Sequence, residues 1–150
     1  MKIDLDVSCL NRPFDDQSEP RIRLESQAVT LLLEGADNGR WEQISSRMAE
    51  IEIVAIPDDV RRRRVLQLLP KSRMELGPQV FRRARRLIEF GIKAVDAVHV
   101  AAAEASDCDA LITCDDRLLR RCRQIATELT IAVANPIDWL KEQSDATNSG

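Results

Sequence analysis

The sequence predicts an α/β fold with a small central parallel sheet flanked by helices. Short apolar stretches alternate with longer helical patterns along the chain, which is typical of parallel strands joined by helices. The chain has 150 residues, of which 44% are hydrophobic and 31% charged, as in an ordinary soluble domain with its own core. We therefore expect one domain over residues 1–142, followed by a polar, disordered tail over residues 143–150.

Two strands are expected in the first third of the chain. Residues 2–7 alternate apolar and acidic side chains, as a strand does, and residues 11–16 read as a loop. A long helix follows over about residues 19–37, because its apolar side chains recur at helical spacing before Asn38-Gly39 stops it. Residues 41–45 form the second short strand.

Helices dominate the remainder of the sequence, with two further strands between them. Capping residues and prolines mark the ends of the first two helices, which run from Ser46 to Pro57 and from Asp58 or Asp59 to Pro70. The elements expected after these are helices over about residues 78–90 and 93–106, a strand over 110–113, a helix over about 116–127, a strand over 130–134 and a closing helix over 137–142.

Bulk properties narrow the classes of protein. No apolar run approaches the roughly 20 residues that cross a bilayer. Acidic residues interrupt the first apolar stretch, unlike a secretory signal, so we expect a cytoplasmic protein with no membrane association. The four cysteines form no CxxC pair and are expected to be reduced thiols rather than zinc ligands.

Acidic residues gather where the strands are expected to end. Asp6 ends the first strand, Asp115 and Asp116 follow the strand over 110–113, and Asp96 opens the helix before that strand. Ligands of open parallel sheets bind at the carboxyl ends of the strands. Several carboxylates at one place are unfavourable without a cation, and hard oxygen donors suit Mg²⁺ or Mn²⁺. The pattern predicts metal-assisted hydrolysis of a phosphate ester.

A further acid is expected from the helix that follows the second strand. Glu50 and Glu52 both lie on it, and the residues alone leave the choice between them open. A single aspartate at a strand end is often only a helix cap, and Asp116 in particular resembles one. The combination of acids, rather than any one of them, carries the prediction.

Arginines form three clusters despite the net charge of −3: residues 61–64, 82–86 and 117–123. A basic stripe beside an acidic pocket would suit nucleic acid, whereas solvated helix faces with i,i+4 ion pairs are the simpler interpretation. Aromatic residues are scarce, with no Tyr, two Trp and three Phe, so few bases can stack on side chains.

These residues together resemble the PIN-domain family over nearly the whole chain, to about Leu140. The resemblance rests on Ile3-Asp4-Leu5-Asp6-Val7-Ser8, on Asp96-Ala97-Val98-His99 within its helix, on Leu111-Ile112-Thr113-Cys114-Asp115 and on the closing Asn135-Pro136-Ile137-Asp138-Trp139-Leu140. It implies a Mg²⁺- or Mn²⁺-dependent endoribonuclease of the kind found as toxins of toxin–antitoxin pairs (VapC-like). Its implied partners are the RNA substrate, an antitoxin protein lying over the acidic pocket, and a second copy in a homodimer.

The resemblance also implies which residues do the chemistry. It maps catalytic metal ligands to Asp6, Asp96, Asp115 and a glutamate, for which the family's usual offset from a serine favours Glu52. The secondary candidates are Asp116, Glu50, Ser8 and Thr113, and His99 is expected to be structural. The arginines expected to hold the RNA backbone are Arg12, Arg82, Arg83, Arg86 and Arg117.

Two other functions fit parts of the sequence. Asp4-Leu5-Asp6-Val7-Ser8 approximates the nucleophile motif of haloacid-dehalogenase-type phosphatases, in which both aspartates act, but Asp96 would then have no role. A PIN-like module that binds RNA or protein without cutting is the non-catalytic alternative, and metal binding would distinguish it from the nuclease.

Overall fold

The computed structural model describes residues 1–149, with side chains described through residue 146. Four parallel strands form one sheet in the order β2-β1-β3-β4. The elements in chain order are β1 (Lys2–Leu5), α1 (Val7–Asn11), η1 (Arg12–Phe14), α2 (Pro20–Asp37), β2 (Glu42–Ile44), α3 (Arg47–Val54), α4 (Asp59–Leu66), α5 (Pro78–Glu89), α6 (Ala94–Ala105), β3 (Ala110–Ile112), α7 (Asp116–Gln124), η2 (Ala126–Glu128), β4 (Ala132–Ala134) and α8 (Pro136–Ser149).

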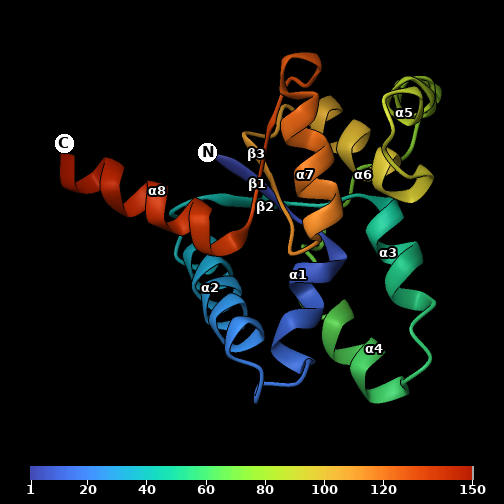
Figure 1. Ribbon diagram of the computed structural model, residues 1–150. Coiled ribbons are helices and arrows are strands. Elements are labelled where there is room, and N and C mark those ends of the chain that lie inside the picture. Colours follow the sequence, from blue (N-terminus) through green and yellow to red (C-terminus); the bar gives the residue numbers. More distant parts are fainter. Residues whose placement is uncertain (150) are drawn as a thin grey trace.

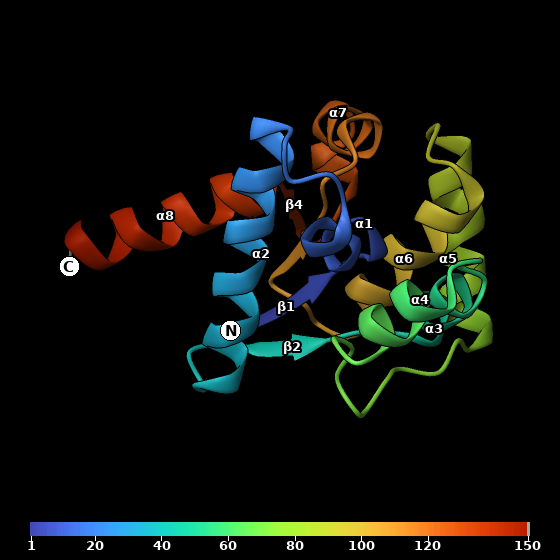
Figure 2. The same ribbon diagram turned by 90° about the horizontal axis from the view of Figure 1, so that it is seen from below.

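Helices cover both faces of the sheet and make two hydrophobic cores (Figures 1 and 2). On one face Ile3, Leu5 and Ile112 pack against α2, α3, α4 and α8, and on the other Leu111 packs against α5, α6 and α7. The neighbours Leu111 and Ile112 enter different cores because successive residues of a strand point to opposite faces of the sheet. The predicted α/β class with a flanked parallel sheet is confirmed.

The segment after β1 is helical, where a loop over residues 11–16 was expected. The Asp6 carboxylate accepts a hydrogen bond from the Cys9 amide (3.2 Å) and so caps α1. The strand ends at Leu5, just before this cap, rather than at residue 7 as expected. A helix of five residues is too short to show an apolar period, so its sequence looked like the end of a strand and a loop.

The tail expected to be disordered from residue 143 is instead part of α8, which continues to Ser149, while Gly150 lies outside the described residues. Trp139 anchors the start of this helix, edge-on to Trp41 with 5.1 Å between ring centroids. Once a helix is nucleated, each added residue costs little, and no Pro or Gly interrupts the segment before Gly150. Figure 1 shows the helix leading away from the sheet.

Candidate active site

The carboxyl ends of β1 and β3 lie side by side and bring two predicted acids to one edge of the sheet. Leu5 pairs with Ile112, and the Asp6 amide donates to the Ile112 carbonyl at 3.0 Å. Asp6 therefore follows β1 at the edge where the chain after β3 leads to Asp115. This is the edge at which parallel sheets bind ligands.

Asp6 is buried, and its carboxylate is held by the loop around it. The Ser8 hydroxyl donates to it at 2.5 Å in addition to the Cys9 amide. Burial raises the pKa of Asp6, while the hydrogen bonds from Ser8 and Thr113 act in the opposite direction. The Ser8 oxygen also accepts from the Cys114 amide at 3.0 Å, so one hydroxyl connects the loops after β1 and β3.

Asp115 caps α7, the role that the sequence suggested for Asp116. Its carboxylate accepts from the Arg117 and Leu118 amides at 2.9 and 3.3 Å, and its own amide donates to the Thr113 hydroxyl at 3.1 Å. Asp116 points elsewhere and forms an exposed two-pronged ion pair with Arg21. Of these two neighbouring aspartates, the structure brings Asp115 to the other acids and directs Asp116 away from them.

Asp96 lies in the first turn of α6, close to the same edge. Its pKa is raised to about 6, first by burial and then by the negative charges of Asp115 and Asp6, with a smaller contribution from Glu52. Such mutual effects arise only between carboxylates that lie near one another. The structure thus groups Asp6, Asp96 and Asp115, with Glu52 close by.

Glu52 and Glu50 point to different surroundings on α3. Glu52 forms a short hydrogen bond with Nε2 of buried His99, one helical turn after Asp96. Glu50 instead pairs with Arg47 at 2.6 Å and with Arg73 at 3.5 Å. Glu52 is therefore the glutamate that faces the acidic edge, and His99 is the residue that holds it there.

Asp4 is a buried neighbour of this group, and the resemblance gave it no role as a metal ligand. It is 5% exposed, and its pKa is raised to about 7, mainly by burial and also by Asp6, while His99 acts in the opposite direction. Asp4 and Asp6 are two residues apart at the end of a strand, a spacing that could have indicated a shared face. We name Asp4, Asp6, Glu52, Asp96 and Asp115 the acidic cluster.

The donor atoms of the acidic cluster suit a hard divalent cation. All are carboxylate oxygens, and the repulsion that raises the pKa of Asp96 is what a bound cation would relieve. Among the described side chains, no three of His, Cys, Asp or Glu are already arranged to share one ion. The chemistry of the residues fits Mg²⁺ or Mn²⁺, and binding would draw the carboxylates closer together.

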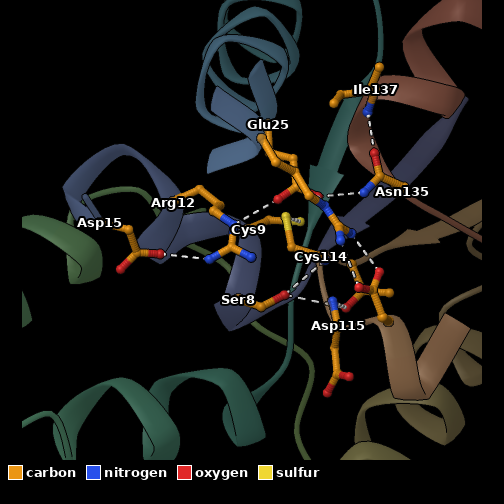
Figure 3. A network of polar contacts seen from close by, with 12 residues as sticks. Ser8, Cys9, Arg12, Asp15, Glu25, Cys114, Asp115, Asn135 and Ile137 are labelled. Carbon is orange, nitrogen blue, oxygen red and sulfur yellow. Dashed lines mark hydrogen bonds and ion pairs between the residues drawn. The ribbon is translucent and has the colours of Figure 1, made fainter. Parts of the chain in front are cut away.

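A second polar network, centred on Glu25, lies beside the loops that follow β1 and β3 (Figure 3). Glu25 is completely buried, and Arg12 and Asn135 donate to its two oxygens at 2.9 and 2.6 Å. Asn135 also caps α8 by accepting from the Ile137 amide at 2.8 Å. The network ties η1, α2 and α8 together, and it could not be predicted from local patterns because its members are far apart along the chain.

Most predicted nucleic-acid arginines are engaged by the chain's own carboxylates. Arg12 pairs with Asp15 and Glu25, Arg83 with Glu104 and Arg86 with Glu89. Arg82 is exposed on α5 next to Arg83, which pairs with Glu104 near the end of α6. Asp96 lies at the start of α6, so Arg82 is near the opposite end of that helix. Arg117 alone of the five candidates lines a pocket that contains Asp96 and Asp115.

The first arginine cluster is also largely structural. Arg61 donates to Asp15 and Asn11, and Arg62 and Arg63 both pair with Asp59. These contacts are the intramolecular ion pairs of the simpler interpretation.

Within the described part of the chain, no helix is long and apolar enough to span a membrane.

Comparisons with known proteins identify the family and the fold. The family model for the PIN domain matches residues 5–124, which is most of the chain. The fold is similar to the crystal structure of FitAcB from Neisseria gonorrhoeae, with a TM-score of 0.58 and 16% sequence identity, over 89% of this chain and 97% of that one. A search among curated proteins finds no match.

Proposed function

Since this chain belongs to the PIN-domain family, we propose that it is a divalent-metal-dependent endoribonuclease whose reaction takes place at the acidic cluster. The observation that carries the proposal is the grouping of Asp6, Asp96 and Asp115 at one edge of the sheet, where burial first and then the charges of Asp115 and Asp6 raise the pKa of Asp96 to about 6. A fold that keeps such charges together without using them would lose stability for no gain.

Asp6, Glu52, Asp96 and Asp115 are the residues that would hold Mg²⁺ or Mn²⁺. The bound ion would activate a water molecule and neutralise the charge on the leaving oxygen of the phosphodiester. Asp6 and Asp115 are kept in place by the hydroxyls of Ser8 and Thr113 and by the first amides of α1 and α7. His99 orients Glu52 toward them.

The alternative of a haloacid-dehalogenase-type phosphatase has no support from the family match. That chemistry would use Asp4 with Asp6 and leave Asp96 without a role, although Asp96 lies close to Asp6 and Asp115. A role as the toxin of a toxin–antitoxin pair, with an antitoxin partner and a homodimer, belongs to our proposal through the family resemblance. Induced expression tests it: the wild type should arrest growth and Asp96→Asn should not.

The experiment that tests the nuclease is RNA cleavage with Mg²⁺ or Mn²⁺ by the wild type, Asp6→Asn and Asp96→Asn. Each variant removes one charge from the acidic cluster and should lower the rate about a hundredfold or more. Asp116→Asn is the matched control, because Asp116 faces Arg21, and it should cut at nearly the wild-type rate.

Two results would contradict the proposal. If Asp6→Asn and Asp96→Asn cut RNA as fast as the wild type, the acidic cluster is not the site of reaction. If the folded wild type binds RNA and Mn²⁺ but cuts no RNA, the non-catalytic alternative is correct.

A further inference from the structure

A pocket of about 270 Å³ opens beside the acidic cluster between α7 and the turn that joins α5 to α6. Asp96 and Asp115 contribute to its lining, together with Lys93, Arg117, Arg120 and Arg121. Two acids of the cluster therefore share one cavity with four cations. Of these four, Arg117 is a residue expected from the sequence to hold RNA, and Arg120 and Arg121 belong to the same arginine cluster over residues 117–123.

In the part of the chain that the structure describes, none of the four cations is within ion-pair distance of a carboxylate, although Arg120 lies close enough to Asp116 to lower the pKa of that aspartate. No ion pair involves Lys93, Arg117, Arg120 or Arg121, whereas Arg12, Arg83 and Arg86 all have carboxylate partners. Around this cavity the four cations outnumber the two acids, Asp96 and Asp115. The excess of positive charge would attract a bound anion.

Helix geometry aims the three arginines at the same cavity. Residues 117, 120 and 121 are spaced by three and four, which puts them on one face of a helix. Leu118 and Cys122 lie on the adjoining side of the helix and are buried in the core against α6, and Leu118 also contributes to the pocket lining. The arginine face of α7 is consequently one wall of the pocket, and its three arginines stay exposed to solvent and to a ligand.

The absence of a side chain at Gly91 leaves room for Arg121. This glycine has a left-handed backbone with φ of +99°, and a Cβ built there would lie only 3.0 Å from Nε of Arg121. The guanidinium of Arg121 thus lies over the bare backbone of the turn after α5. A side chain at this position would have both a strained backbone and a clash with that arginine.

The geometry points to a subsite for the RNA backbone: we propose that Lys93, Arg117, Arg120 and Arg121 bind a phosphate of the strand next to the one that is cut. The inference rests on the proposed function, which places the scissile phosphate at Asp96 and Asp115. An acidic cluster repels a polyanion, and a cation-lined wall beside it offsets that repulsion. Guanidinium groups suit phosphate oxygens because they donate paired hydrogen bonds.

Binding of fluorescein-labelled single-stranded RNA, followed by anisotropy in EDTA, tests the subsite without cleavage. The double variant Arg120→Ala/Arg121→Ala should bind at least about tenfold more weakly than the wild type at moderate salt, because each lost phosphate contact lowers the salt slope by about 0.7. The double variant Arg82→Ala/Arg85→Ala removes the same charge from exposed positions on α5 and should bind within about twofold of the wild type. Arg120→Lys/Arg121→Lys should retain most of the salt slope.

The outcomes separate the subsite from the nuclease proposal. Equal weakening by the α7 and α5 double variants would overturn the subsite, even if Mg²⁺-dependent cleavage by the wild type stands. Selective weakening by the α7 variant supports it, even in a protein that cuts no RNA. In the cleavage assay, the α7 variant should raise KM several-fold with little change in kcat, because it loses binding energy away from the reacting phosphate.

Discussion

The imidazole Nε2 of His99 contacts a carboxylate oxygen of Glu52 and so joins α6 to α3 at the acidic cluster. Burial lowers the pKa of His99, but the hydrogen bond and charge of Glu52, with the charges of Asp6 and Asp4, outweigh it and raise that pKa. The ring therefore keeps its proton more readily, and its Nε2–H donates a hydrogen bond to the Glu52 carboxylate. His99 lies one helical turn after Asp96, so the same helix supplies an acid and the residue that positions another.

The two glutamates of α3 should differ sharply in activity. We expect Glu52→Gln to lower Mg²⁺-dependent RNA cleavage by about a hundredfold, because it removes a charge that faces Asp96. Glu50→Gln should stay within about threefold of the wild type, since Glu50 pairs with Arg47 and Arg73. Initial rates under identical conditions measure both, and the reverse order would move the fourth metal ligand to Glu50.

His99 should act on metal affinity rather than on the reaction itself. His99→Ala frees Glu52, and residues that orient a metal ligand contribute about 10- to 100-fold to affinity. We expect Mn²⁺ binding, followed by calorimetry, to weaken by that factor and cleavage to recover when Mn²⁺ is raised. His99→Gln, which can still donate to Glu52, should restore much of the affinity. An unchanged Mn²⁺ affinity in His99→Ala would remove the positioning role.

The strands, the helices and three of the acids could be predicted because their signals are local. Caps, prolines and apolar periods mark the elements. Asp6 and Asp115 follow strands of a parallel sheet, and Asp96 lies in the first turn of the helix before β3. Glu52 could be favoured over Glu50 by a family offset alone. Their different roles depend on which way a turn of α3 faces, and that is decided by His99, 47 residues away.

Buried charges and free cations could not be predicted, because their partners are distant in sequence. Glu25 is fully buried only because Arg12 and Asn135 meet it, and the sequence offers no sign of that meeting. The arginine clusters look alike in sequence, yet those of α4 are mostly paired and those lining the pocket at α7 are not. Only the fold shows which clusters have neighbouring acids.

Glu104 should make the stability of the fold depend on pH in the acid range. Burial raises its pKa, but hydrogen bonds from Arg83 at 2.8 Å and from Thr130 outweigh it, so the pKa lies below its ordinary value of 4.5. Because the pKa of Glu104 is lower in the folded protein than in the unfolded chain, the ion pair stabilises the fold at pH values above 4.5. The contribution is lost as the pH falls through the folded pKa.

Thermal unfolding at several pH values between neutral and about pH 3 measures this contribution. We expect Glu104→Gln to lower the Tm at neutral pH and to show a smaller fall in Tm on acidification than the wild type. Glu89→Gln removes a carboxylate from an exposed pair with Arg86 and should give a curve parallel to the wild type. A parallel curve for Glu104→Gln as well would show that the network carries no pH dependence.

Glu25 should be among the most important polar side chains for stability. Its carboxylate accepts hydrogen bonds from Arg12 and Asn135 and lies 3.6 Å from Arg21. A neutral amide in its place would leave the partly buried Arg12 without the negative charge that it pairs with. Breaking a buried ion pair costs about 3–5 kcal/mol, and the partial exposure of Arg12 places the expected loss for Glu25→Gln nearer to about 2–3 kcal/mol. Urea unfolding followed by tryptophan fluorescence reports it, because Trp41 and Trp139 pack beside α2 and α8. Glu34→Gln changes an exposed carboxylate on the same helix and should shift the free energy of unfolding by less than about 0.5 kcal/mol. If the two variants were equally stable, the network around Glu25 would not hold α2 and α8 together.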